Sequence, residues 1–200
     1  MRMLKLFAAA ALAGSLGACS AGMAASSMPA GDGMAQGTAM MNPMVGGKAM
    51  MPSMNIVQNA LNSPDHTTLV AAVKAAGLVA TLEGPGPFTV FAPTNEAFAA
   101  LPAGTVPTLL QPANKAKLVQ VLTYHVVPGR LDFAAMKKLI MAGGGKAMLK
   151  TVEGGTLTIM MNGPRNIVVE DAHGDIADIS TYDVYQSNGV IQVIDKVLLP

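Results

Sequence analysis

The chain has 200 residues, of which 51% are hydrophobic, with one cysteine and a formal net charge of +1. This length suits one ordinary domain with a hydrophobic core, plus a leader or a tail. A near-neutral chain has no electrostatic reason to bind nucleic acid, and a single cysteine cannot form an internal disulfide. The composition therefore excludes nucleic acid as a partner and leaves stability to the core.

The first 18 residues have the pattern of a secretory signal. Arg2 and Lys5 precede an uncharged apolar stretch, residues 6–16, which is shorter than the roughly 20 residues of a membrane-spanning helix. Residues 16–19, Leu-Gly-Ala-Cys, resemble the bacterial lipobox, which implies a cleaved signal peptide at 1–18 and an acylated Cys19. An ordinary signal peptide that is cut elsewhere is the alternative.

The lipobox resemblance also implies a location. An acylated Cys19 would hold the exported chain in the bacterial cell envelope through its lipid. Ser20 resembles the outer-membrane sorting choice of Gram-negative lipoproteins. Without the lipid, the chain would be secreted or periplasmic.

Residues 19–53 are mainly Ala, Gly, Ser, Pro and Met, without a repeating apolar face. Such a segment cannot bury enough surface to offset its ordering entropy, so we expect a flexible tether. Thioether sulfur suits Cu(I), and two Met-Met-x-x-Met groups could bring several sulfurs together. Their residues are Met40, Met41, Met44, Met50, Met51 and Met54. Compositional drift and sacrificial oxidation are the other interpretations, and no His or Cys joins the methionines.

A folded domain is expected over residues 54–200, beginning with two helices. An apolar stripe at residues 56, 57, 60 and 61 predicts a helix with Ser53 as its N-cap. A second helix is expected to follow directly, with Asp65 as its N-cap and with Gly77 in the left-handed position after its end.

Strand and helix then alternate. Residues 88–93 have the β-branched and aromatic content of a strand, and Thr94 predicts the N-cap of the next helix. Further helices are expected over 114–122 and 132–141. The last third has short alternating segments around 149, 156–161, 167–170, 176–180 and 190–199, which favour antiparallel sheet. The fold class is therefore α+β.

Three segments of this domain resemble the fasciclin (FAS1) family. They are residues 88–98, FTVFAPTNEAF, the central segment LTYHVVPG at 122–129, and the closing segment NGVIQVIDKVLLP at 188–200. The signature residues are Phe91, Pro93, Thr94, Asn95, Phe98, Asn188, Gly189 and Asp195. The chain departs from the family at Gln192, where His is more common, and we expect the fold to tolerate it.

The resemblance implies a wedge of about seven mainly antiparallel strands with several helices packed on it. It also implies a role in adhesion or matrix contact, without a common enzyme activity or cofactor. Bacterial members with a lipoprotein leader and one such domain have the same arrangement.

Tyr124 and His125 are the candidate interaction residues, because the Tyr-His segment has been linked to adhesion in animal relatives. A buried histidine that is hydrogen-bonded to backbone is the alternative, and the pattern favours it. Residues 170–175 place three acids and His173 together, which suits either a divalent ion or a hairpin turn, and the turn is favoured. His66 is expected to be exposed.

No pattern of catalysis is found in the sequence, which lacks a Gly-x-Ser-x-Gly segment and a P-loop ending. The hypothesis is therefore a non-enzymatic envelope module, without a cofactor, that binds a protein or a polysaccharide. Its membrane contact would be the lipid on Cys19. The alternative is a Cu(I)-handling protein that uses the Met-rich segment.

Overall fold

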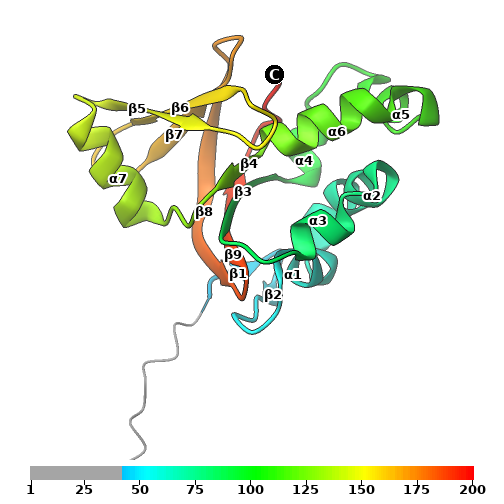
Figure 1. Ribbon diagram of the computed structural model, residues 1–200, viewed down its shortest axis with the longest axis horizontal. Helices are drawn as coiled ribbons and strands as arrows, with labels where there is room; N and C mark the ends of the chain where they lie inside the picture. The colour runs from blue at the N-terminus through cyan, green and yellow to red at the C-terminus, as the bar shows by residue number, and fades with distance from the viewer. Residues whose placement is uncertain (1–41) are drawn as a thin grey trace, which may run out of the picture. The chain divides into compact units, whose positions relative to one another are not determined.

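A computed structural model of the chain describes residues 42–200 (Figure 1). Its helices are α1 (Ile56–Asn62), α2 (Thr67–Ala76), α3 (Val79–Glu83), α4 (Asn95–Ala99), α5 (Thr105–Leu109), α6 (Lys115–Tyr124) and α7 (Phe133–Ala142). Its strands are β1 (Met44–Val45), β2 (Lys48–Ala49), β3 (Phe88–Pro93), β4 (Val126–Pro128), β5 (Lys146–Lys150), β6 (Thr156–Met161), β7 (Ile167–Glu170), β8 (Ile176–Gln186) and β9 (Gly189–Ile194). The signal segment, Cys19, Met40 and Met41 lie outside the described residues.

Seven of these strands form one sheet in the order β4-β3-β9-β8-β7-β6-β5. All neighbours are antiparallel except β3 and β9, which run parallel from Phe88 beside Gly189 to Pro93 beside Ile194. The expected α+β class, with a mainly antiparallel sheet of seven strands, is confirmed. The parallel pair was not foreseen, because the two strands are about a hundred residues apart in the sequence.

Two hydrophobic cores lie on the two faces of the central strands. Val90 and Ala92 of β3 point into the first core, together with α1, α2, α4 and α6, whereas Phe91 points into the second core with α7 and β5 to β8. In Figure 1, α7 accordingly stands on one side of β3 and β9, and the other helices stand on the opposite side. Because both faces of these strands are buried, their sequences are almost continuously apolar.

The helix ends follow local sequence signals in most places. Thr94 accepts a hydrogen bond from the Ala97 N–H, and Asp132 accepts one from the Ala135 N–H, so both are N-caps. Gly77 ends α2 with φ +75°, as expected. The expected caps of the first two helices are wrong. Asn55, not Ser53, caps α1, because it forms a reciprocal capping box with Gln58.

Asp65 does not cap α2. It lies in a 3-10 turn, Pro64–His66, and α2 begins only at Thr67. One of the first backbone amides of α2 is capped from elsewhere in the chain, because Asn95 Oδ1 accepts a hydrogen bond from the Thr68 N–H (3.0 Å). A cap from a residue 27 positions away leaves no local sequence signal.

The segment before α1 differs from the expected tether. Residues 44–49 form the hairpin β1-β2, and Val45 and Met50 are buried in the first core. The Asn42 side chain bonds the backbone of Tyr185 in β8. Its Nδ2 donates to the Tyr185 carbonyl (2.5 Å), and its Oδ1 accepts from the Tyr185 N–H (2.9 Å). The folded unit thus includes residues 42–53.

A buried asparagine holds this hairpin in place. Asn59 of α1 accepts a hydrogen bond from the Met51 N–H (3.0 Å), donates to the Met51 carbonyl (2.7 Å), and also donates to the side chain of Gln186. Hydrogen bonds of the Asn42 and Asn59 side chains thus hold this segment to the domain, although its sequence has no long apolar run. Within residues 42–200, no helix is long and apolar enough to cross a membrane.

Candidate functional site

His125 lies at the end of α6 and is buried, with 3% of its surface exposed. Its Nδ1 lies 2.8 Å from the Val121 carbonyl, and its Nε2 lies 3.0 Å from the Leu198 backbone nitrogen. The Leu198 N–H must donate to Nε2, so Nδ1 carries the proton and donates to Val121. Both ring nitrogens are therefore occupied by backbone groups, and neither can contact a partner.

Burial lowers the pKa of His125 to about 4, although the Val121 carbonyl and Asp171 oppose this shift. The neutral ring is the form that accepts the Leu198 N–H, so burial and hydrogen bonding favour the same state. At neutral pH the side chain acts as an uncharged connector between α6 and the C-terminal segment.

Tyr124 is also buried, with 1% of its surface exposed. Its hydroxyl donates to the Thr156 carbonyl (2.8 Å) and accepts from the Ala172 N–H (3.0 Å), and burial raises its pKa. Its ring lies against Gly155, where an added Cβ would be 2.7 Å from the ring. The Tyr-His pair therefore connects α6 to three distant segments of the second core.

The acidic segment 170–175 is a turn that Asp171 organises. Asp171 Oδ1 accepts the N–H groups of His173 (2.9 Å) and Asp175 (3.0 Å), and its Oδ2 accepts the Leu199 N–H (3.0 Å). These bonds use both carboxylate oxygens for the backbone. Among the described residues, no group of three or more His, Cys, Asp or Glu side chains is arranged to hold a metal ion.

Two signature asparagines act as connectors. Asn95 Nδ2 donates to the Pro64 carbonyl (2.9 Å), in addition to its contact with the start of α2. Asn188 Oδ1 accepts the Ile56 N–H at the start of α1 (3.1 Å), and its Nδ2 donates to the Leu82 carbonyl in α3 (2.7 Å). These side chains satisfy backbone groups at helix ends that have no partner in their own helix.

The remaining signature residues surround the parallel pair. Phe91, Pro93 and Phe98 are buried, and the Thr94 N–H continues the pairing by donating to the Ile194 carbonyl (3.2 Å). Asp195 Oδ1 accepts the Asp178 N–H (2.8 Å). A Cβ on Gly189 would lie 2.1 Å from the Phe88 carbonyl oxygen, so glycine is required there.

Gln192 is fully buried between β8 and the segment that precedes α7. Its Oε1 accepts the Asp183 N–H (3.1 Å), and its Nε2 donates to the Leu131 carbonyl (3.0 Å) and to Asp183 Oδ1 (3.1 Å). Asp183 has φ +57° and in turn accepts the Phe133 N–H at the start of α7 (2.7 Å). Both N–H groups and the carbonyl oxygen of the Gln192 side chain thus have partners.

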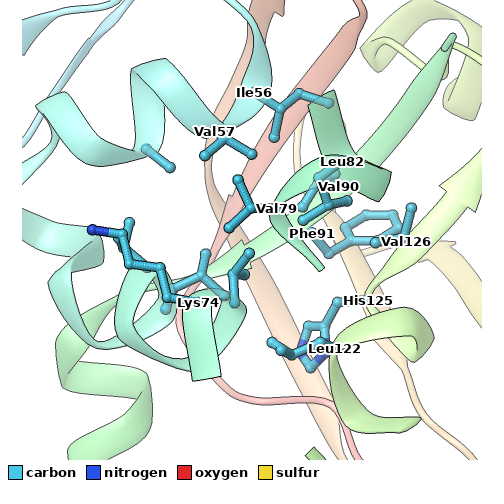
Figure 2. A pocket seen from close by; sticks show the side chains of 14 residues that line it. Ile56, Val57, Lys74, Val79, Leu82, Val90, Phe91, Leu122, His125 and Val126 are labelled. Carbon is cyan, nitrogen blue, oxygen red and sulfur yellow. The ribbon is translucent and has the colours of Figure 1, made fainter. Parts of the chain in front are cut away.

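An apolar pocket of about 40 Å³ lies between α1, α2, α3, α6 and β3 (Figure 2). Its lining includes Val57, Leu82, Val90 and Leu122, and Lys74 and His125 contribute its few polar groups. Figure 2 shows Lys74 and His125 on opposite sides of this lining. The volume is far below the 300 Å³ or so at which ligand pockets begin, so it suits a packing defect better than a substrate site.

His66 is buried rather than exposed, which corrects the expectation from the sequence. Its Nδ1 lies 2.9 Å from Ser63 Oγ, whereas its Nε2 has no hydrogen-bond partner within residues 42–200. Burial lowers its pKa. It lines a second apolar cavity, of about 30 Å³, beside Val45 and Met50.

The described methionines of the Cu(I) hypothesis are divided between the core and the surface. Met44, Met51 and Met54 are exposed, whereas Met50 is 4% exposed and packs in the first core. In the group Met50-Met51-x-x-Met54, the side chain of Met50 is therefore packed in the core, so its sulfur is not at the surface with those of Met51 and Met54. A core position explains Met50 without a metal.

One surface feature was missed by sequence reasoning, namely the open side of strands β5 to β8. Their inner side chains, such as Leu149 and Leu157, pack with α7 in the second core. The alternating side chains form what we call the outer face. Its members are Lys146, Met148, Lys150, Thr156, Thr158, Met160, Val168, Glu170, Ile176 and Asp178, of which Val168 is buried. Met148 is 80% exposed and Ile176 is 43% exposed. The strand register places Met148 and Ile176 in one row across the four strands, and the sequence alone does not show this.

The family model for the fasciclin domain matches residues 64–200. The chain belongs to the fasciclin family. Fasciclin domains are in general non-catalytic adhesion modules. The matched range contains all three signature segments, and the structure extends the folded unit upstream to residue 42.

Several proteins share this fasciclin domain. The protein sll1483 of Synechocystis is 48% identical over 149 residues, which are 74% of each chain. The immunogenic protein MPB70 of Mycobacterium bovis is 35% identical over 146 residues, 70% of this chain and 66% of that protein. The transforming growth factor-beta-induced protein ig-h3 of Sus scrofa is 35% identical over 156 residues, 76% of this chain but 20% of that much longer protein.

The fold of a solved fasciclin structure agrees. The FAS1 domain pair of the insect cell adhesion molecule fasciclin I superposes with a TM-score of 0.66 and 18% identity. The alignment covers 74% of this chain and 51% of that one. This similarity establishes the fold of the domain, whereas function has to be argued from the surface.

Proposed function

We propose that this chain is a lipid-anchored protein of the bacterial cell envelope whose fasciclin domain binds a protein partner. The proposal combines the lipobox at Cys19 with a domain family of adhesion modules. The domain itself would make the contact, and residues 20–41 would connect it to the lipid.

The outer face is the observation that supports binding through a surface. One row of side chains runs across four strands, from Met148 through Thr158 and Glu170 to Ile176. It mixes flexible apolar side chains with charged and hydroxyl groups, and methionine adapts its shape to a partner. The polar residues of the signature segments in the interior, such as His125 and Asn188, are by contrast used for backbone contacts.

The surface favours a protein over a polysaccharide. Sugar rings commonly stack on exposed aromatic side chains, yet every aromatic residue between positions 42 and 200 is buried or half-buried. The large apolar side chains that are exposed are Met, Leu, Val and Ile, including Met141 at 70%. Such side chains fill pockets on a protein partner more readily than they bind sugar.

The test compares the chain from residue 20 with the described domain, residues 42–200, on a panel of purified cell-surface and matrix proteins and on a glycan array. We expect both forms to bind the same protein saturably, with equal affinity with and without Cu(I). The proposal would be overturned if only glycans were bound, or if binding required residues 20–41 together with copper.

The anchor is tested separately. Cys19→Ser should move the chain from the membrane fraction to the soluble fraction of the producing bacterium, and should abolish labelling with a radioactive fatty acid. Unchanged membrane association of the unlabelled variant would show that another segment attaches the protein.

A further inference from the structure

We infer that the free edge of β5 binds an extended acidic segment of a partner protein as an additional strand of the sheet. This inference rests on the proposed function, since it specifies how the domain contacts a protein. β5 is the last strand of the seven-stranded sheet and pairs only with β6. An edge strand presents backbone groups that a second chain can pair with.

The register identifies which backbone groups are free. The Thr151 N–H donates to the Gly155 carbonyl (3.0 Å), so this pair belongs to the hydrogen-bonded positions of the β5-β6 ladder. Bonded and non-bonded pairs alternate in antiparallel sheets, so Leu149 and Ala147 also face β6. The backbone groups of Lys150, Met148 and Lys146 therefore point away from β6, toward the edge.

The free tract is short and bounded. At one end the Val152 N–H donates to the Val126 carbonyl of β4 (2.8 Å), so the sheet nearly closes there. At the other end, Gly143 lies against the Lys146 carbonyl, because a Cβ on Gly143 would be 2.0 Å from that oxygen. Met148 is the open position between these contacts, and Lys150 lies between it and the contact with β4, which suits a partner segment of about five residues centred on Met148.

The side chains beside this edge define the chemistry of the partner. Lys146 and Lys150 flank Met148 on the outer face, and all three are exposed. A paired strand would place its residues opposite these three positions. Acidic residues opposite the lysines and an apolar residue opposite Met148 give the pattern acid-x-apolar-x-acid.

The same charges disfavour two other occupants. A second copy of β5 centred on Met148 would place Lys146 opposite Lys150 in the antiparallel arrangement, and like charges opposite each other destabilise a sheet. The first 41 residues of the chain contain one acidic residue, Asp32, so they cannot supply the pattern.

The probe is a blocked peptide of sequence Thr-Glu-Thr-Val-Thr-Glu-Thr, titrated into the chain from residue 20 and followed by amide NMR. We expect saturable binding with a dissociation constant below ~1 mM and weaker binding as salt increases. Amide hydrogen exchange should slow at Met148 and Lys150, whereas the Ala147 and Leu149 amides, which already face β6, should change little. Binding without this alternating protection would overturn the inference, as would no binding at all.

Three variants sharpen the test. K146E/K150E should weaken binding of the peptide at least tenfold and should instead bind the same peptide with Lys in place of Glu. The matched control K115E/K117E makes the same charge change on exposed positions of α6 and should bind like the parent. M148P removes one free edge N–H that the fold does not use, so it should fold but lose binding.

Equal loss of binding in both charge-reversal variants would show unspecific attraction and would overturn the inference. Anionic phospholipid vesicles provide a further comparison, because vesicle binding that competes with the peptide without slowing the Met148 amide would identify a membrane surface instead. If the peptide fails while a purified protein still binds elsewhere on the domain, only this inference is lost and the proposed function remains.

Discussion

The Leu198 backbone N–H donates to Nε2 of His125, 3.0 Å away, although 73 residues separate them in the chain. The next amide, that of Leu199, donates to Asp171 Oδ2. Two buried side chains thus hold the C-terminal segment against α6 and the turn after β7. The Tyr-His segment that suggests a binding site in the sequence has, in this structure, the contacts of an internal connector.

This contact makes stability depend on pH. The pKa of His125 is about 4 in the folded chain and near 6.5 in the unfolded chain, so the unfolded state takes up the proton first. Stability is fully present above pH 6.5 and decreases as the pH falls from 6.5 to 4, by up to roughly 3 kcal/mol. Urea unfolding at pH 7 and pH 4.5 measures this loss.

The control for this prediction is His125→Gln, which does not titrate. It should be less stable than the parent at pH 7 but should lose less stability between pH 7 and 4.5. His66 remains in the variant, and its lowered pKa produces a residual loss of the same sign. An identical pH dependence of parent and variant would contradict the assignment to His125.

Asn188→Ala should lower the free energy of unfolding by about 2–4 kcal/mol, because it leaves backbone groups of Ile56 and Leu82 without partners. Asn114→Ala is the matched control, since Asn114 makes one exposed bond to the Thr108 carbonyl and should cost less than about 1 kcal/mol. Guanidinium denaturation distinguishes the two. Equal effects would show that Asn188 does not connect the helices.

Gly189→Ala should separate β9 from β3, since the new Cβ would meet the Phe88 carbonyl oxygen at 2.1 Å. We expect a loss above about 3 kcal/mol or failure to fold. Gly47→Ala adds a Cβ in open space at φ +72°, so its cost is the backbone conformation alone, about 1 kcal/mol. Thermal unfolding followed by circular dichroism compares them, and a mild effect at Gly189 would refute the tight pairing.

Met50→Ala should destabilise the domain by about 2–4 kcal/mol, because it leaves a cavity in the first core. Met51→Ala removes the neighbouring, half-exposed side chain and should cost less than about 0.5 kcal/mol, since its backbone contacts to Asn59 remain. The denaturation midpoints of the two variants decide whether residues 42–53 belong to the fold. Similar midpoints would restore the description of this segment as a tether.

The sequence by itself determined those features whose cause lies within a few residues. Thr94 and Asp132 cap the helices that follow them, and Gly77 ends α2, because capping needs only an oxygen or a left-handed residue next to the helix. The strands of the last third followed from alternation. The closing segment was expected to reach residue 199, but β9 ends at Ile194, where its pairing with Pro93 ends.

Only the tertiary structure decided which distant groups meet. The β1-β2 hairpin folds because Asn42 reaches Tyr185 and Asn59 reaches Met51, and a segment rich in Gly, Ala and Met gives no local sign of these contacts. The burial of His66, the parallel pairing of β3 with β9, and the free edge at Met148 likewise depend on partners far away in the chain. Pairing and burial arise from packing of the whole domain, whereas helix caps and strand alternation are local.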